Sequence, residues 1–541
     1  MNLVLLALSL ISLTAATGLG SRYLPMVPLP LLQVAVGIGL GLSGIDGFKA
    51  DLQPEVFLFL FVPPLLFADG WRLPKREAFL LRSQILLHAF ILVLVNVVVV
   101  GYFLHWLRPD IPLWAAFALG SVLSPTDAVA VSAISRKIKV PRTLMHILQG
   151  EALLNDASGL VALKFSLLAS IGAFTFGGAA GNILLVSVAG AAVGAGLAWS
   201  YGKLRLWLAA PDGSTTIPLV LLLVLLPFGA YFLAESLHVS GILAAVSAGV
   251  MMTYTDPTHD DNAALRLQAG NFFSLFTYVF NGLIFLLLGL QVPRILDAGV
   301  RAAEATGHGA GHLLMLVVAV TSAILLIRLA WGWGESRLAR IRDPGNAAVA
   351  QELPGARLLL AHTVAGIRGA VTLAAAISLP IQIAGGSRFP ARDELILIAG
   401  GVIILTLIIA AVALPPLLRD LPMEEEKAIE QERAEAAVKA SHAAIDAIAR
   451  APSLEQQGTP GATDVIQVVT AQYQQKIEAK QQESNGTQSE AMEHDMTRET
   501  RLVGLRAERE ELHRLHNAGE INDETLNVLM KPLDLAEESL R

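Results

Sequence analysis

Thirteen stretches of about 20 mostly apolar residues follow one another along the first 420 residues of this chain. Each is long enough to cross the hydrocarbon core of a bilayer as a helix. Lipid offers the backbone no hydrogen-bond partners, so only helices and closed barrels span it, and unbroken apolar runs of this length are typical of helices. The chain is 16% charged, whereas a soluble domain is about 25% charged. The sequence therefore predicts an all-α integral membrane protein.

The first stretch has no basic segment and no small-residue cleavage site, so we expect it to be a retained first helix. The second and ninth stretches are short, and we expect them to be tilted or broken. The thirteen predicted spans are residues 2–20, 27–43, 54–70, 80–106, 112–134, 145–172, 181–207, 216–236, 239–254, 271–291, 311–334, 357–383 and 394–418.

The loops between the predicted spans carry unequal numbers of basic residues. With the N-terminus outside, the inside loops hold 16 Lys and Arg and the outside loops hold 6. Basic loops remain on the cytoplasmic side. We therefore expect an outside N-terminus, a cytoplasmic C-terminus and a multi-pass protein of the bacterial plasma (inner) membrane.

The composition changes abruptly near residue 421, where a polar segment rich in Glu, Gln, Ala, Lys and Arg begins. Residues 436–449 and 502–515 have helical apolar spacing, whereas residues 452–463 and 483–489 resemble linkers. The segment contains no phosphate-binding loop and no nucleophile motif. We expect residues 421–541 to form a helical cytosolic tail with a regulatory role and a partner that the sequence does not identify.

Two predicted spans are interrupted by residues that disfavour a continuous helix. In span 5, Pro125 removes a backbone donor, and Ser124, Thr126 and Asp127 surround it. In span 12, the interruption is Gly366-Ile367-Arg368-Gly369. Broken helices at corresponding places in two halves are typical of transporters, which bind ions at the midplane between them. Spans 4–6 and 11–13 are thus predicted to be the paired units of an inverted repeat.

Span 6 contains two acids, although a carboxylate at mid-bilayer costs about 2.5–3.5 kcal/mol. Glu151 and Asp156 are separated by roughly 140° around a helix, so we predict that Asn155 and Asp156 face the break of span 5 while Glu151 points elsewhere. Glu151 then needs its own cation, either Arg328 or Arg368. Such a pair could hold the helices together or take part in transport.

The motifs around these residues resemble those of the monovalent cation:proton antiporters of the NhaP-like and sodium/proton-exchanger type. The resemblance rests on SPTDAV in span 5, GEALLNDASGLVA in span 6, FVPPLLFADGW (61–71) and GIRGAVTLA (366–374). It covers about residues 1–420. It implies a NhaA-like fold of thirteen helices, a homodimer, and a core of spans 4–6 and 11–13 that moves against a dimerisation scaffold of spans 1–3 and 7–10.

The resemblance also implies roles for individual residues. Asp156 matches the aspartate that binds the ion or the proton, with Na⁺ held by Asp156 and Thr126, and Asn155 matches its partner. Thr126 and Asp127 match the unwound crossing, and Ser124 is a further candidate ligand. Glu151 with Arg328, or with Arg368, matches a supporting charge pair.

Two positions depart from the family pattern. Ala152 stands where many relatives have a serine ligand, so we expect water or a backbone oxygen to replace that ligand. Ala68 stands where the acid of span 3 is usual, and Asp69 follows it, which leaves the role of Asp69 open.

We therefore expect a sodium/proton antiporter, also accepting lithium or potassium, in which Na⁺ and H⁺ compete for Asp156. One aspartate beside a neutral amide predicts electroneutral one-for-one exchange and a part in pH homeostasis. The alternatives are a potassium/proton antiporter of the same fold and a sodium-coupled solute symporter. The chain has no cysteine and no histidine metal motif. We expect neither enzymatic activity, nor a cofactor, nor nucleic-acid binding.

Overall fold

In the computed structural model the secondary structure of the described residues is helical, with no β-strand among them apart from an isolated bridge between Gln382 and Arg388. Contacts within the chain divide it into two compact units, Met1–Leu421 and Pro422–Arg541. The described residues are 3–24, 27–43, 54–73, 75–135, 140–170, 176–208, 215–255, 263–305, 309–342, 355–383, 387–419, 424–449, 469–475, 477, 507–509, 511, 512, 514, 529, 530 and 533.

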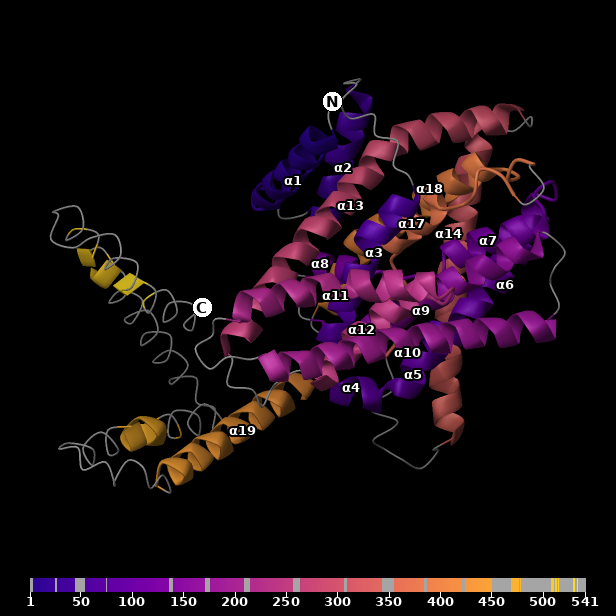
Figure 1. Ribbon diagram of the computed structural model, residues 1–541. Helices are drawn as coiled ribbons and strands as arrows, with labels where there is room; N and C mark the ends of the chain where they lie inside the picture. The colour runs from indigo at the N-terminus through magenta and orange to yellow at the C-terminus, as the bar shows by residue number, and fades with distance from the viewer. Residues whose placement is uncertain are drawn as a thin grey trace. The chain divides into compact units, whose positions relative to one another are not determined.

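The helices of the first unit are mostly labelled in Figure 1. They are α1 (Leu3–Gly20), α2 (Leu29–Leu42), α3 (Pro54–Arg72), α4 (Lys75–Leu80), α5 (Arg82–Leu86), the π-helical turn η2 (Leu87–Leu92), α6 (Val93–Leu107), α7 (Leu113–Val122), α8 (Ala128–Ile134), α9 (Arg142–Ala169), α10 (Phe176–Leu208), α11 (Thr216–Ser236), α12 (Gly241–Thr255), α13 (Ala263–Ala305), α14 (Ala310–Arg342), α16 (Ala356–Val364), α17 (Ala370–Ile377) and α18 (Arg392–Leu418).

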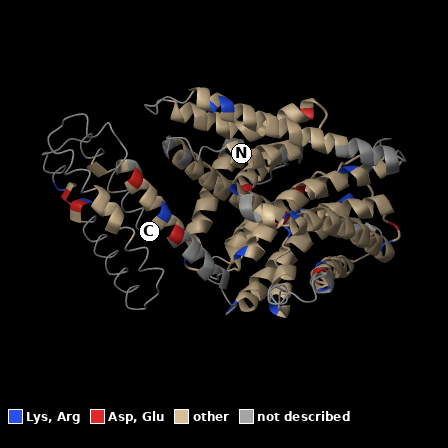
Figure 2. Cartoon of the chain, turned by 90° about the horizontal axis from the view of Figure 1, so that it is seen from below, with Lys and Arg blue, Asp and Glu red and all other residues tan. Residues whose placement is uncertain are grey.

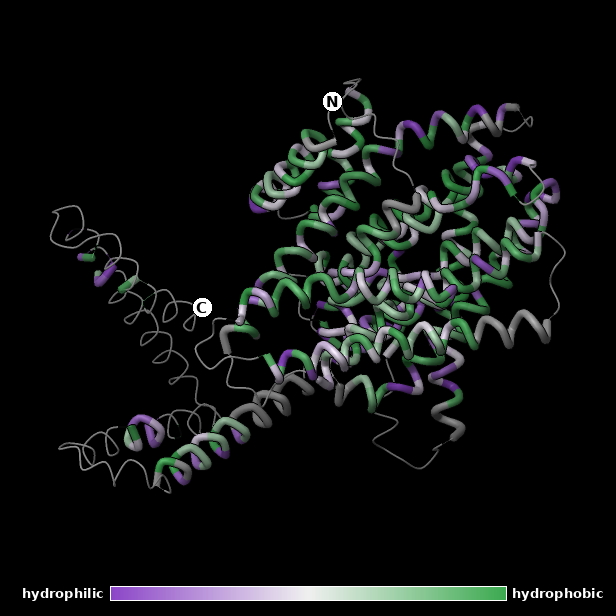
Figure 3. Tube along the Cα trace, viewed as in Figure 1, coloured by the Kyte–Doolittle hydropathy of each residue, from purple (hydrophilic) through white to green (hydrophobic). Residues whose placement is uncertain are grey.

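These helices have the length and apolar surface of a membrane protein. Within the described ranges, seven helical runs are long and apolar enough to cross a bilayer: α5 to α6, α9, α10, α11, α13, α14 and α18. Four shorter helices, α1, α2, α7 and α12, are also apolar. Charged residues are sparse on the helices of this unit (Figure 2), and apolar residues predominate along most of them (Figure 3). The protein is a multi-pass membrane protein.

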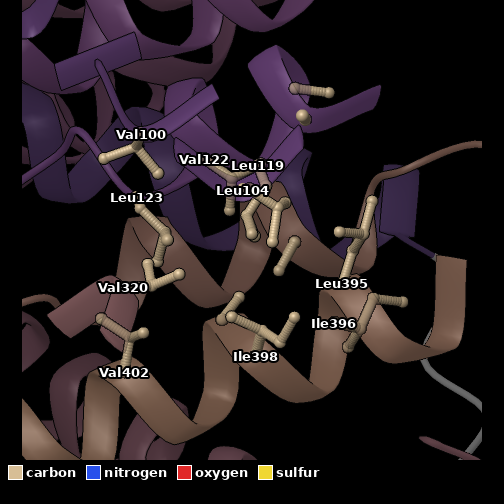
Figure 4. Packing of buried hydrophobic residues seen from close by; sticks show 14 of the residues in the cluster. Val100, Leu104, Leu119, Val122, Leu123, Val320, Leu395, Ile396, Ile398 and Val402 are labelled. Carbon is tan, nitrogen blue, oxygen red and sulfur yellow. The ribbon is translucent and has the colours of Figure 1, made fainter. Parts of the chain in front are cut away.

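One large apolar cluster joins α6, α7, α14 and α18 (Figure 4). Its residues recur at helical spacing, as with Val100 and Leu104 on α6, so each helix presents one stripe to its neighbours. On α18 the stripe is formed by Leu395, Ile398 and Val402, all fully buried. Through this cluster, α18 supports the helices that carry both chain breaks.

Helices α2 and α13 approach each other at backbone distance. A Cβ atom added to Gly37 would lie 2.9 Å from the Cα atom of Gly289, and one added to Gly289 would lie 2.9 Å from the Cα atom of Gly37. Each would also overlap a backbone carbonyl of the opposite helix, that of Leu286 or Val34. Glycine at both positions permits this contact, as in the small-residue interfaces of membrane helices.

In the second unit the structure describes α19 (Glu424–Ala449) and short helical pieces further along. The helix predicted over residues 436–449 forms the end of α19. The predicted linkers, and most of the segment 502–515, lie outside the described residues.

Candidate functional site

Two non-helical segments meet in the first unit. Helix α7 ends at Val122 and α8 begins at Ala128, and α16 ends at Val364 while α17 begins at Ala370. The backbone N–H of Asp127 donates to the carbonyl of Ile367 at 2.8 Å. A backbone group freed by a broken helix needs such a partner, because lipid supplies none.

Asp127 caps the short helix that follows the first segment. Its Oδ1 atom accepts hydrogen bonds from the backbone N–H groups of Val129 (2.9 Å) and Ala130 (3.0 Å). A carboxylate here satisfies two free donors and neutralises the positive end of the helix dipole. The second non-helical segment also packs against Asp127, since a Cβ atom on Gly369 would overlap the Asp127 carboxylate.

Helix α9 brings Asn155 against the first segment. The Asn155 side-chain NH₂ donates to the Thr126 hydroxyl at 2.7 Å, and its carbonyl accepts from the Thr126 backbone N–H at 3.4 Å. The amide therefore holds Thr126 from two sides. The neutral amide is suited to this task because it both donates and accepts, whereas an ionised carboxylate can only accept.

Asp156, the residue that follows Asn155 on α9, is 7% exposed. Its Oδ1 atom is buried and has no hydrogen-bond partner among the residues described. Buried polar atoms are nearly always satisfied, so this carboxylate oxygen is free to bind a ligand.

Asp156 lines a cavity of about 250 Å³. Its polar lining comes from α3, α8, α9, α13 and α17, together with the segment before α8. The lining residues with oxygen-bearing side chains include Asp69, Thr126, Asp127, Asp156, Asn281 and Thr372. Carboxylate, hydroxyl and amide oxygens are the ligands that a hard cation prefers, so the residues present fit a monovalent cation as cargo.

Glu151 forms a buried, bidentate ion pair with Arg328. The guanidinium Nη1 atom donates to Oε1 at 2.5 Å and Nη2 donates to Oε2 at 2.7 Å, while Nε donates to the carbonyl of His362 at 3.0 Å. Both charged side chains are nearly inaccessible, at 1% and 2% exposure. Of the two cations predicted for Glu151, the structure thus places Arg328 on it.

Arg368 lies elsewhere, although it is also buried. Its guanidinium Nη1 atom donates to the carbonyl of Gly366 at 2.8 Å, and its backbone N–H donates to the Thr406 hydroxyl at 3.2 Å. These contacts stabilise the second non-helical segment from within and from α18.

The expected separation of Glu151 from the break of span 5 is wrong. The Thr126 hydroxyl donates to Glu151 Oε1 at 3.4 Å. Glu151 and Asn155 are four residues apart, so they share a face of α9 and both reach Thr126. The ion pair is therefore connected to the site through one hydroxyl group.

Two other candidates have contrasting positions. The Ser124 hydroxyl donates to the carbonyl of Gly120 at 2.8 Å, and Ser124 is not part of the cavity lining. Asp69 is part of the lining, one turn before Arg72, which also lines the cavity. Ala152 lines the cavity without offering an oxygen atom.

Sequence reasoning missed Asn281 and Thr277 on α13 and Thr372 on α17, which also line the cavity. The available signal was the amide of Asn281 in the middle of the apolar span 271–291. The Thr372 hydroxyl donates to the carbonyl of Pro125 at 3.4 Å, which links α17 to the first non-helical segment.

A family model described as sodium/hydrogen exchanger, transmembrane, matches residues 7–420. The chain belongs to the sodium/hydrogen exchanger family. The family predicted from the motifs is therefore confirmed. Members of this family are transporters, and exchange of Na⁺ for H⁺ across a membrane is the activity that their names state.

Two relatives are similar over almost the whole chain. The uncharacterized Na⁺/H⁺ exchanger YjcE of Escherichia coli (strain K12) is 38% identical over 535 residues, covering 97% of this chain and 96% of the relative. A protein named sodium, potassium, lithium and rubidium/H⁺ antiporter from Bacillus subtilis (strain 168) is 34% identical over 545 residues, covering 98% of this chain and 77% of the relative.

Among solved structures, the sodium proton antiporter MjNhaP1 from Methanocaldococcus jannaschii at pH 8 has a similar fold. The TM-score is 0.58 at 16% identity, and the match covers 78% of this exchanger and 99% of that chain. The helical fold is thus similar to that of this NhaP antiporter.

Proposed function

We propose that this exchanger carries one Na⁺ or one H⁺ at a time on Asp156, and that Li⁺ and K⁺ can take the place of Na⁺. The observation that carries the proposal is the unpartnered Oδ1 atom of Asp156 at the wall of the cavity. Thr126, which Asn155 holds in place, supplies the neighbouring hydroxyl oxygen to the cation.

Competition at one carboxylate explains why the two ions are coupled. An ionised carboxylate without a counter-charge is costly to bury. Either a bound proton or a bound monovalent cation removes that cost, and the two cannot occupy the same oxygen together. The carrier therefore crosses between the two sides only when loaded, and no other energy source is required.

The identity of the cation is part of the proposal. The Bacillus subtilis relative is named for sodium, potassium, lithium and rubidium, which supports a broad selectivity at the corresponding site. A potassium/proton antiporter is the second candidate. A sodium-coupled solute symporter is less well supported, because the cavity of about 250 Å³ is smaller than the roughly 300–1,000 Å³ of most small-molecule sites.

We propose that exchange is electroneutral. The neighbour of Asp156 is the amide Asn155, which exchanges hydrogen bonds with Thr126 and carries no charge. Asp127 is committed to the start of α8, and Glu151 is committed to Arg328. Of these three carboxylates, Asp156 is then the one that changes its ligand during the cycle.

The proposed architecture has thirteen spans with an inverted repeat. Spans 4–6 and 11–13 form a moving core, and spans 1–3 and 7–10 form the scaffold of a homodimer. The cavity is lined from both groups, by Asp156 and Thr372 of the core and by Asp69 and Asn281 of the scaffold. In the plasma membrane, the N-terminus is outside, the C-terminus is cytoplasmic, and residues 421–541 regulate exchange in the service of pH homeostasis.

The test is proton flux in proteoliposomes supplied in turn with Na⁺, K⁺ and Li⁺. Asp156→Asn is expected to abolish flux with every cation while remaining folded, because it removes a charge from the membrane interior. Asp297→Asn is the matched control, since Asp297 is an exposed acid of α13 that pairs with Arg301. Sodium-dependent flux in Asp156→Asn comparable to that of the control would reject the proposal.

A further inference from the structure

A second group of buried polar side chains lies beside the Glu151–Arg328 pair. It contains the imidazoles of His88, on η2, and His362, on α16, whose ring centroids are 5.1 Å apart and whose planes are nearly perpendicular. Glu335, on α14, reaches His88 with its Oε2 atom 3.6 Å from Nε2. None of these three residues lines the cavity at Asp156.

The hydrogen bonds of His88 define where its protons are. Nδ1 lies 2.8 Å from the carbonyl of Gln84. A carbonyl only accepts, so Nδ1 carries a proton, and in a neutral ring Nε2 must then be an acceptor. This Nε2 atom is buried and has no hydrogen-bond partner in the described part of the chain. His88 as a whole is 2% exposed.

Glu335 faces this nitrogen with an acceptor of its own. Its Oε1 atom accepts from the indole N–H of Trp331 at 3.1 Å, which leaves Oε2 turned to His88. A lone pair on nitrogen opposite a carboxylate oxygen is repulsive, and a buried acceptor without a donor is costly. A single proton between the two atoms removes both penalties.

We propose that His88 and Glu335 form a second proton-binding site, separate from Asp156, that adjusts how η2 supports α9. One proton is shared between His88 Nε2 and Glu335 Oε2. Glu335 is 31% exposed, whereas His88 is buried, so Glu335 is the member through which the proton enters and leaves.

The groups around the pair favour a proton over a metal ion. Ligand atoms of His88, Glu151 and His362 lie within 4.8 Å of one another, but both oxygens of Glu151 are bound to Arg328. Arg328 Nη2 also lies 3.3 Å from His362 Nε2, and a guanidinium only donates. His362 is therefore a neutral acceptor, and a metal ion here would face a fixed positive charge.

Among the described residues, the charged groups that face the pair are Glu151, on α9, and Arg328, on α14, whose opposite charges cancel. His362, on α16, is neutral for the reason above. On the flanking helices, Arg82 of α5 donates to the carbonyl of Phe79, and His105 of α6 is bound at the carbonyl of Ile111. The cluster is thus neutral with the shared proton and carries one negative charge without it.

His88 is also connected to the helix that carries Asp156. It lies in η2, a π-helical turn, and such turns free backbone groups and recur at functional sites. The carbonyl of the next residue, Ala89, accepts a hydrogen bond from the Ser158 hydroxyl at 2.5 Å. Ser158 is two residues beyond Asp156 on α9. The turn η2 therefore links the His88–Glu335 pair to α9 through the hydrogen bond from Ser158 to Ala89.

Glu335→Gln provides the test, because its amide donates a permanent, pH-independent hydrogen bond to His88 Nε2. In wild type the folded state holds a proton that an unfolded histidine releases above about pH 6.5. Above about pH 6.5, the unfolding equilibrium constant of wild type should therefore rise, relative to that of Glu335→Gln, by up to about tenfold per pH unit. The change levels off once the pair itself loses its proton.

Thermal unfolding in detergent is measured between pH 6 and 10 for wild type, Glu335→Gln, His88→Gln and Glu304→Gln. Glu304 is an exposed glutamate of α13, and its variant should parallel wild type. Both variants of the pair should lose the same pH-dependent component, also in the Asp156→Asn background, where no exchange occurs. If Glu335→Gln is not monodisperse, the pH dependence of unfolding of His88→Gln decides the proposal instead.

Exchange rates over the same pH range provide the second measurement. The wild-type rate should fall at alkaline pH relative to that of Glu335→Gln, since only wild type loses the shared proton. Curves for Glu335→Gln that parallel wild type in either measurement overturn the proposal. The melting comparison in Asp156→Asn is independent of whether Asp156 carries ions, so failure of the proposed exchange mechanism would remain distinguishable.

Discussion

The buried pair of Glu151 and Arg328 provides a prediction with a defined magnitude. Replacing Glu151 by Gln keeps the shape but removes the charge opposite Arg328. The amide oxygen can still accept one guanidinium N–H, but the amide NH₂ would face the other donor. Of the two hydrogen bonds at 2.5 and 2.7 Å, one is lost. The positive charge of the guanidinium, which is only 2% exposed, is left without an opposite charge. Breaking such a buried pair costs about 3–5 kcal/mol.

The control is a second buried ion pair among the described residues of the first unit, between Arg108 and Glu394. Arg108 also donates to both oxygens of Asp110, at 2.8 and 2.6 Å. Glu394→Gln therefore leaves the guanidinium with a carboxylate partner, and we expect a clearly smaller loss than for Glu151→Gln. The double variant Glu151→Gln/Arg328→Gln should recover much of the loss, because it leaves no unpaired charge.

The assay is unfolding in mixed detergent micelles, followed by tryptophan fluorescence, for the three variants and wild type. The expected order of stability is wild type, Glu394→Gln, then Glu151→Gln, with the double variant above Glu151→Gln. Equal stability of Glu151→Gln and wild type, combined with loss of exchange, would refute the structural assignment and move Glu151 into the transport cycle.

Three further outcomes are expected. Asp127→Ala should reduce the free energy of unfolding by about 0.5–2 kcal/mol, because α8 loses its cap, as measured in the same micelles against Ser132→Ala. Gly369→Ala should lose exchange, measured in proteoliposomes, because its Cβ atom overlaps the Asp127 carboxylate; wild-type flux would contradict this geometry. With valinomycin-clamped potentials, wild-type exchange should be unaffected, whereas Asn155→Asp should respond, since each charge moved is worth about 2.3 kcal/mol per 100 mV.

The central part of the site could be predicted from sequence because it is local. Pro125 disfavours a continuous helix wherever it stands in a span, and the residues beside it must then serve the break. Asn155 and Asp156 follow from an acid in an apolar window. These inferences depend on chain chemistry over a few residues, which lipid makes unusually strict.

The remaining part depends on how the helices are rotated. Arg328 and Arg368 are both basic residues within apolar spans, and nothing in the sequence distinguishes them as partners for Glu151. The structure separates them because Arg368 turns back to the carbonyl of Gly366. Likewise, Asn281 reaches the cavity and His88 reaches Glu335 only through packing between distant segments, for which one sequence contains no signal.

The glycine contact between α2 and α13 has a consequence for the history of the family. Gly37 and Gly289 touch across two helices that are far apart in the gene, so neither codon can change alone without forcing the backbones apart. A mutation that enlarges one residue has no room to be compensated at the other, which already lacks a side chain. Among natural variants of this chain, we expect the two positions to drift less than the apolar residues around them and to retain glycine together.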